Sequence, residues 1–167
     1  MSYGSAIPYV KQAFYTAADA RSGLSAVKVL RDWPRTEEDT VSADGTPEVV
    51  WCGRQGHQDA TSDSEVKILT AGTKRLDETF TVWFTAQVLH QDGNMKSASD
   101  RVWTIGYELV AVVANAPGLS VDANPEIEYC YVDGVQTDEH TRHLQSGGSA
   151  SELWVGINCK SRLNATL

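Results

Sequence analysis

Residues 79–88, TFTVWFTAQV, alternate strictly between two kinds of side chain. One set is rich in threonine and has Trp83 at its centre. Because successive side chains of a strand point to opposite faces, this pattern predicts a strand with one face on a core. The other face carries no charge, which raises the question of what covers it. The apolar set comprises Phe80, Val82, Phe84, Ala86 and Val88.

A second alternating segment, residues 152–163, predicts another long strand near the C-terminus. Apolar residues at helical spacing predict two helices, one over 6–20 and one from a capping sequence at Ser97 to about 116. In a strand expected at 126–132, the side chains of Ile127, Tyr129 and Tyr131 fall on one side. Further strands are expected at 26–33 and 48–53, polar loops at 35–46 and 133–150, and residues 54–73 fit no single element.

The order of these elements predicts an α+β fold. Two amphipathic helices can cover one face of a mostly antiparallel sheet of about four to five strands, but not both faces. A chain of 167 residues fits one domain, which we expect to span residues 1–167 with long polar loops. The second sheet face is then either surface exposed to solvent or a contact surface.

Charge and cysteine content argue against several classes of protein. A net charge of −8 without a basic cluster disfavours binding to nucleic-acid phosphates. The longest apolar run, at about 109–114, is too short to span a bilayer, and the N-terminal residues lack a secretory pattern, so we expect no membrane association. Three widely spaced cysteines, Cys52, Cys130 and Cys159, predict reduced thiols in a protein made in a cytoplasm.

The chain contains no motif for nucleophilic catalysis, phosphate binding or dinucleotide binding. Asp138, Glu139 and His140 are titratable neighbours, but they lie in an expected polar loop without a rigid pocket. We therefore predict no enzymatic activity and no catalytic residues.

A zinc site is the alternative that the histidines leave open. Its ligands lack the tight paired spacing of zinc-binding signatures, and surface histidines with a half-buried thiol explain the pattern as well. We therefore predict no metal site and no cofactor. The four ligands of such a site would be Cys52, His57, His140 and His143.

The tryptophans indicate a contact surface. Trp33 and Trp103 fit core or core-edge positions, whereas Trp83 and Trp154 lie at the centres of the non-core sides of their strands. If the two strands pair, Trp83 and Trp154 would form an aromatic pair on the uncovered face. Tryptophan is enriched in binding hot spots, so we favour a contact surface over a side chain that fills a gap on a monomer. Residues 37–39, EED, are either a solvated loop or an acidic docking surface.

As a whole, the chain resembles the tail terminator, or tail completion, proteins of long-tailed bacteriophages. The resemblance covers about residues 5–163, and residues 57–73 and 133–150 match the family pattern least. It rests on the order of the segments VKQAFYTAADA, VKVLRDWP, EVVWCG, KRLDETFTVWFTAQV, SDRVWTIGYELVAVVANAPGL and ELWVGINCKSRL.

The resemblance implies a structural protein of the virion, located in the tail and neck region and assembled in the cytoplasm of the bacterial host. A hexameric ring of such subunits would stop polymerisation of the tail tube at its head-proximal end and join the tail to the head connector. The implied partners are other copies of the chain, the tail tube protein and the connector. DNA would pass through the channel without specific binding, which agrees with the acidic charge.

A ring needs a heterologous interface, in which one patch meets a different patch of the next copy. Alternatives are another neck, connector or minor tail protein, a monomeric binding module that uses the sheet face, and a small hydrolase that uses His140 or His143. We expect subunit or tube contacts from Arg75, Asp77, Glu78, Thr81, Trp83, Thr85, Trp154 and Lys160.

Overall fold

A computed structural model describes residues 5–31, 47–53, 62–68, 75–116, 119, 127–145 and 147–164, with only the backbone at 62–68, 75, 76 and 164. Two helices dominate: α1 (Ile7–Asp19) and α2 (Met95–Asn115), with a short 3-10 turn, η1 (Ser22–Leu24), after the first. Neither helix in these ranges combines the length and hydrophobicity that crossing a bilayer requires. The strands are β1 (Lys28–Leu30), β2 (Glu48–Cys52), β3 (Ser62–Ile68), β4 (Arg75–His90), β5 (Ile127–His143) and β6 (Ser149–Asn164).

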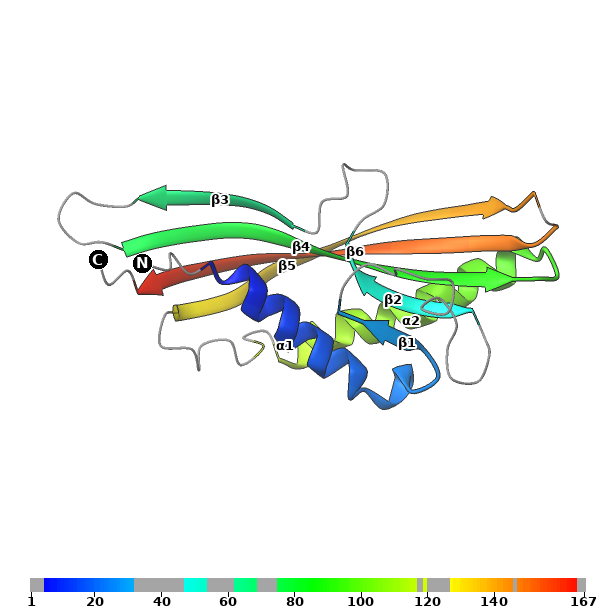
Figure 1. Ribbon diagram of the computed structural model, residues 1–167, viewed down its shortest axis with the longest axis horizontal. Coiled ribbons are helices and arrows are strands. Elements are labelled where there is room, and N and C mark those ends of the chain that lie inside the picture. Colours follow the sequence, from blue (N-terminus) through cyan, green and yellow to red (C-terminus); the bar gives the residue numbers. More distant parts are fainter. Residues whose placement is uncertain are drawn as a thin grey trace.

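The strands form one six-stranded sheet in the order β1-β2-β4-β6-β5, with β3 also paired to β4 (Figure 1). β3 lies along the first half of β4 and β2 along its second half. Every pairing is antiparallel except that of β1 with β2. The α+β fold with a mostly antiparallel sheet is confirmed, and the sheet exceeds the expected four to five strands because β3 falls in the undecided segment.

The two long alternating segments pair with each other over their full length. β4 and β6 run from the pair Arg75–Asn164 to the pair His90–Ser149. We call the sheet face that carries Phe84 and Leu153 the helix face, and the opposite face, which carries Trp83 and Trp154, the outer face. The predicted apolar rows lie on the helix face, where no residue from Phe80 to Val88 in that row is more than 2% exposed.

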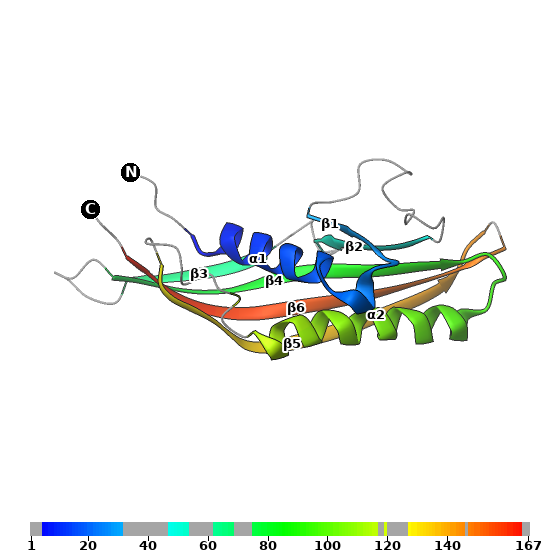
Figure 2. The ribbon, with the colours of Figure 1, turned by 90° about the horizontal axis from the view of Figure 1, so that it is seen from below.

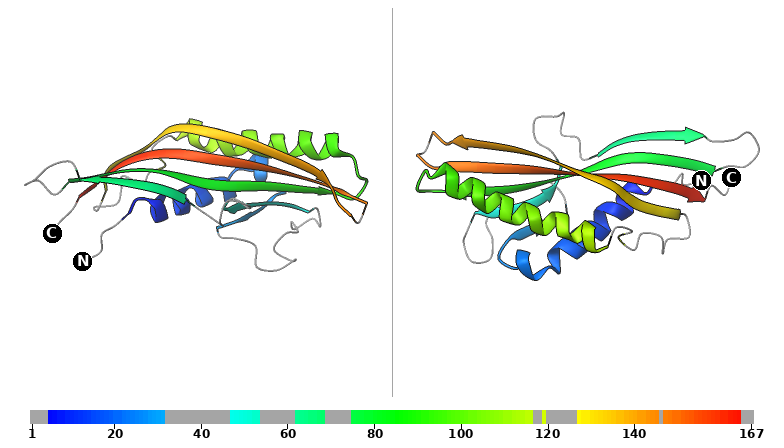
Figure 3. Two further views of the ribbon diagram at one scale, coloured as in Figure 1. Left: turned by 90° about the horizontal axis from the view of Figure 1, so that it is seen from above. Right: turned by 180° about the vertical axis from the view of Figure 1, so that it is seen from behind.

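Both helices pack on this one face. The Phe14 ring of α1 lies against the Phe84 ring of β4, with ring centroids 4.0 Å apart. At Gly106, α2 approaches the sheet so closely that an added Cβ would collide with the Leu153 side chain of β6. In Figure 2 the helices lie in front of the strands, and from the opposite side, in Figure 3 (left), the strands lie in front of the helices. The predicted apolar stripe of α2, from Val102 to Val113, is buried there.

A buried glutamate attaches the start of α1 to the sheet. Glu78 of β4 points to the helix face and is 2% exposed. Its Oε2 accepts a hydrogen bond from the Ala6 backbone N–H at 3.0 Å, and its Oε1 accepts one from Ser5 Oγ at 2.6 Å. Ser161 Oγ of β6 adds a third donor at 3.3 Å. A carboxylate in this place satisfies N–H groups at a helix start and complements the positive end of the helix dipole.

Two ion pairs hold α2 in the same layer. Arg101 of α2 binds Glu48 of β2 through two hydrogen bonds, from Nε at 2.7 Å and from Nη2 at 2.6 Å. About two turns further along α2, Glu108 pairs with Arg21 and so joins the two helical segments. The bidentate geometry of Arg101 fixes the helix against β2 as well as neutralising a half-buried carboxylate.

Four details differ from the sequence-based expectations. The expected polar loop at 133–150 is strand as far as His143, and the expected strand at 26–33 shrinks to Lys28–Leu30. α2 begins earlier than predicted: the capping residue is Asn94, whose side chain accepts the Ser97 backbone N–H at 3.1 Å. A register shift between Ile127 and Tyr129 turns Tyr129 and Tyr131 to the outer face, away from Ile127, because a bulge adds one residue to the strand. Residues 35–46 and Trp33 lie outside the described residues.

Replacing Glu78 with alanine will loosen the attachment of α1. The Glu78→Ala variant loses an acceptor for three donors and leaves the Ala6 N–H buried, so we expect the free energy of unfolding to fall by about 2–3 kcal/mol. Urea denaturation followed by circular dichroism measures the loss. The exposed neighbour Thr79 gives the control, because Thr79→Ala removes no such contact. Equal stability of the two variants would contradict this role for Glu78.

Candidate contact surface

The centre of the outer face is already covered within one chain. Trp51, Trp83 and Thr85 lie there and are 3%, 8% and 0% exposed. The Thr85 hydroxyl donates to the Gly53 carbonyl at 2.5 Å. The expectation of an uncovered face is therefore wrong at this point, because side chains of neighbouring strands enclose Trp83 and Thr85.

Trp83 and Trp154 are not directly opposite each other. In the β4–β6 ladder, Trp83 pairs with Gly156 and Trp154 pairs with Thr85, so the two tryptophans occupy diagonal positions. The Trp83 ring lies over Gly156: an added Cβ there would come within 2.7 Å of Trp83 Cζ3. Trp83 therefore fills the space left by a glycine, which was the alternative explanation of this residue, whereas Trp154 is half-buried.

The half of the outer face near β3 carries cross-strand polar pairs. Arg162 binds Asp77 at 2.8 Å, and its guanidinium lies 5.1 Å from the centre of the Tyr129 ring. Lys160 binds Asp133 at 2.7 Å, which raises the pKa of the Lys160 ammonium, chiefly through that hydrogen bond. The Lys160–Asp133 pair is solvent-exposed and so contributes little to stability, whereas the Arg162–Asp77 pair is partly buried.

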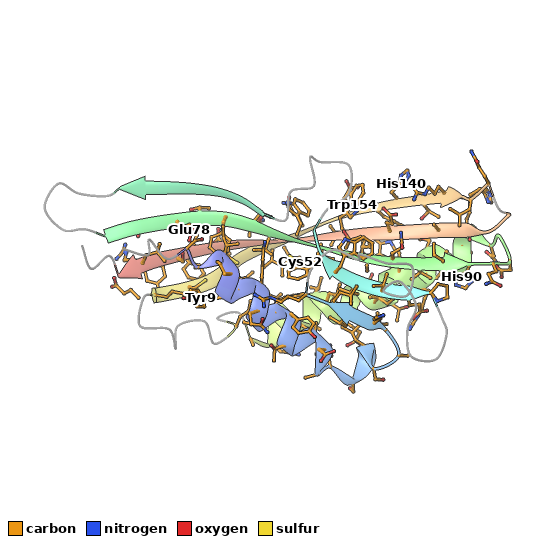
Figure 4. The ribbon with its side chains drawn as sticks, in the orientation of Figure 1. Tyr9, Cys52, Glu78, His90, His140 and Trp154 are labelled. Atoms are coloured by element: carbon orange, nitrogen blue, oxygen red, sulfur yellow. The ribbon has the colours of Figure 1, made fainter. Side chains whose placement is uncertain are left out.

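Of the eight predicted contact residues, the structure leaves some accessible and encloses others. Glu78 and Thr85 are buried with partners inside the chain, and Trp83 is nearly so. Asp77 and Lys160 bind Arg162 and Asp133, and Thr81 donates to Asn158 Oδ1 at 2.8 Å. Trp154 lies with His140 in the half of the sheet remote from Glu78 (Figure 4). The side chain of Arg75 lies outside the described part.

β5 forms a long open edge beside these residues. Among the described strands it pairs only with β6, and no residue from Asp133 to His143 is buried. Tyr131 and Val135 are 42% and 37% exposed, which is high for large apolar side chains. On the helix face, a shallow groove of about 210 Å³ separates β5 from α2 and is lined by Val110, Val113, Ala114, Val132, Asp133, Gly134 and Val135. An exposed edge strand presents unpaired backbone donors and acceptors and is a template for strand addition.

Glu139 organises a polar cluster under α2, a role that no sequence pattern indicated. Glu139 lies on the helix face of β5 and accepts hydrogen bonds from Ser99 Oγ and Trp103 Nε1, both at 2.6 Å. Thr141 and Ser151 donate to the same carboxylate, at 2.9 and 3.3 Å. Burial alone would raise the pKa of Glu139, but the four hydrogen bonds outweigh burial and lower it. The residue is thus a fixed anion that joins α2 to the β5–β6 hairpin.

The proposed acid–base group is divided between two faces. Glu139 pairs with Leu153 on the helix face, whereas Asp138 and His140 pair with Trp154 and Glu152 on the outer face. The strand alternation that separates them was missed because this segment was expected to be a loop. Three consecutive strand residues cannot converge on one reacting atom.

The hypothetical zinc ligands are also separated. Cys52 is buried on the helix face, His140 is exposed on the outer face, and His57 is outside the described residues. Within the described ranges, no group of three or more histidine, cysteine or acidic side chains is placed to hold a metal ion. None of the three cysteines forms a disulfide, and all three are buried. A hydrogen bond with Cys130, together with burial, raises the pKa of the Cys159 thiol, so this thiol is not a reactive ligand at neutral pH.

Comparison with known proteins identifies no relative: no protein-family model and no curated protein matches the chain.

The stability contributed by Glu139 will depend on pH. Its folded-state pKa lies below the ordinary value of 4.5, so its contribution is present above that pH and is lost as the pH falls through the folded pKa. We expect Glu139→Gln to lower the free energy of unfolding at pH 7 by about 1–2 kcal/mol. The difference from the wild type should shrink below pH 4.5 in urea titrations. Asp19→Asn, on the exposed surface of α1, is the matched control, and a difference from wild type that is constant with pH would contradict the assignment.

A side chain at position 156 will displace Trp83. We expect Gly156→Ala to lower the free energy of unfolding by about 1–3 kcal/mol, because the new Cβ would overlap the Trp83 ring and Gln136. Gly134→Ala is the matched control in the neighbouring strand, since a Cβ there meets only Asn158 Nδ2 at an ordinary 3.7 Å. Thermal unfolding of both variants tests the difference. If the two variants are equally stable, Trp83 does not depend on the glycine.

Proposed function

We propose that the chain is a structural subunit that assembles with copies of itself into a ring at the head-proximal end of a bacteriophage tail tube. The ring would stop polymerisation of the tube and present a surface to the head connector. The single observation that most supports this proposal is the exposed 17-residue edge strand β5, which lies at the opposite side of the sheet from the edge strands β1 and β3. Two different open edges on one subunit are what head-to-tail assembly requires.

The chemistry of the described residues supports a contact role over catalysis. Glu78, which is buried, and Glu139, whose pKa is lowered by hydrogen bonds, bind donors that attach the helices to the sheet. The groove beside β5 is lined mainly by valines and contains one carboxylate, Asp133, which already binds Lys160. Such a groove suits an apolar side chain of a partner rather than a reacting substrate.

Another neck or connector protein is the second candidate, because it would use the same open edges. Tube binding separates the two. A tail terminator binds the end of a bare tube, whereas a connector protein binds only after the terminator is in place.

Mixing the purified protein with bare tail tubes tests the proposal. Negative-stain images should show a cap at one end of each tube, and capped tubes should not lengthen when tube protein is added. Trp154→Ala should weaken capping by about tenfold or more if the half-buried Trp154 lies in the interface, whereas Trp154→Phe should retain most of it. Before the capping assay, thermal unfolding should show that both variants have unfolding temperatures close to that of the wild type.

Tubes that remain uncapped and continue to grow would rule out the terminator function. Capping by Trp154→Ala at wild-type concentrations would leave that function standing and remove Trp154 from the contact surface.

A further inference from the structure

A β-bulge divides β5 into two parts. The register between β5 and β6 shifts between Val132 and Gly134, so Asp133 is an extra residue at which the ladder is interrupted. The part of β5 after the bulge, residues 134–143, runs along the edge of the sheet, where His140 marks it in Figure 4. We call residues 134–143 the strap.

The strap lacks the apolar anchors that hold the neighbouring parts of the sheet. Before the bulge, Ile127 and Cys130 of β5 are buried in the core. Within the strap no residue is buried, and its only aliphatic side chain, Val135, is 37% exposed beside the groove. β6, in contrast, pairs with β4 along its whole length and places the fully buried Leu153 in the core. Segments with few buried apolar contacts open locally at a lower cost in free energy than global unfolding.

Glu139 attaches the strap to α2. It lies in the middle of the strap and accepts hydrogen bonds from Ser99 Oγ and Trp103 Nε1 of α2, both at 2.6 Å. We propose that the strap opens as a unit, away from β6 and α2, while the rest of the sheet stays folded, and that Glu139 is the latch that keeps the strap closed.

Two further side-chain contacts hold the strap less strongly. The Thr141 hydroxyl lies 2.7 Å from Ser151 Oγ of β6, but both groups are neutral and both also donate to Glu139. On the outer face, Arg142 approaches Glu152 at 3.4 Å with its own side chain 48% exposed, so this ion pair contributes little. Hydrogen bonds to a carboxylate are about twice as strong as those between neutral groups, so the closed state depends mainly on Glu139.

The bulge sets where the opening stops. The ladder is already interrupted at Asp133, and Cys130 anchors the strand before that point in the core. Peeling that starts at the connection between β5 and β6 therefore ends at the bulge, because the next step would pull apolar side chains into water. The strap is thus a unit with a hinge at one end and a latch near its middle.

An open strap changes the surface of the molecule. Beyond the bulge, β6 becomes the edge strand of the sheet, and the groove beside α2 loses the wall that Gly134 and Val135 provide. The inference concerns a single chain and goes beyond the proposed function, so it holds with or without a ring.

Hydrogen exchange of backbone amides tests the strap. Amides of the strap should exchange faster than those of β4, and their rates should change little in low concentrations of urea, because local opening exposes little surface. Glu139→Gln should speed exchange in the strap by about tenfold, because the amide nitrogen of glutamine cannot accept the bonds from Ser99 and Trp103. NMR spectroscopy resolves the individual amides at pH 7.

Glu78→Ala is the matched control, because it removes the glutamate that attaches the other helix to the sheet. Its loss lowers the free energy of global unfolding without touching the strap. Exchange in β4, which requires global unfolding, should therefore become faster, whereas exchange in the strap should stay within about twofold of the wild-type rate.

A disulfide clamp provides an independent measurement. Thr141 and Ser151 are directly opposite each other in the β5–β6 ladder, where Cα atoms lie about 4.5–5.5 Å apart, a separation that suits a disulfide. In the variant that combines Thr141→Cys with Ser151→Cys, oxidation should slow exchange in the strap by about tenfold or more. The same protein after reduction is the control, and the native cysteines are buried.

Three results would overturn the local opening: strap amides with the protection and urea dependence of β4 amides, equal acceleration of strap exchange by Glu78→Ala and Glu139→Gln, and unchanged strap exchange in the oxidised clamp. Unchanged strap exchange in Glu139→Gln would overturn the role of Glu139 as the latch.

Discussion

The structure depends on the ladder between β4 and β6, in which two 16-residue strands pair along their entire length. At about 3.3 Å per residue, such strands extend roughly 50 Å, far beyond what one short helix can cover. The apolar rows of both strands face the same way, so the two helices must share one layer on that face. This constraint explains the elongated arrangement in Figure 1 and leaves the opposite face to be closed by side chains alone.

Glutamates fix the helices at points along this ladder. Glu78 binds the start of α1, Glu48 binds Arg101, and Glu139 binds Ser99 and Trp103 of α2. Each carboxylate is hydrogen-bonded to several donors, which compensates the cost of removing charge from water. Apolar burial sets which face the helices cover, and these directional contacts set where along the sheet each helix sits. The positions of these glutamates therefore specify where each helix docks along the sheet, which a continuous apolar strip would not do.

The sequence predicted what depends on a periodic apolar face and missed what does not. The alternation in β4 and β6 and the apolar stripe in α2 each arise because one side of the element is buried, and all three predictions are confirmed. The second half of β5 is exposed on both faces at a sheet edge and so lacks an apolar period, and the sequence of β3, SDSEVKI, is mostly polar, so these segments were interpreted as loop and as undecided. The burial of Trp83 depends on Gly156, 73 residues later, and the role of Glu78 depends on Ser5, which is 73 residues earlier. Such long-range partners leave no local signal.

The same edge strands determine how a sheet of this kind can associate. A long open edge can pair non-specifically with strands of other chains, and charged side chains along the edge are the usual protection against this. On β5 the outer-face row from Asp138 to Arg142 places an acidic and a basic residue on either side of His140, so this edge offers no continuous apolar surface to another strand.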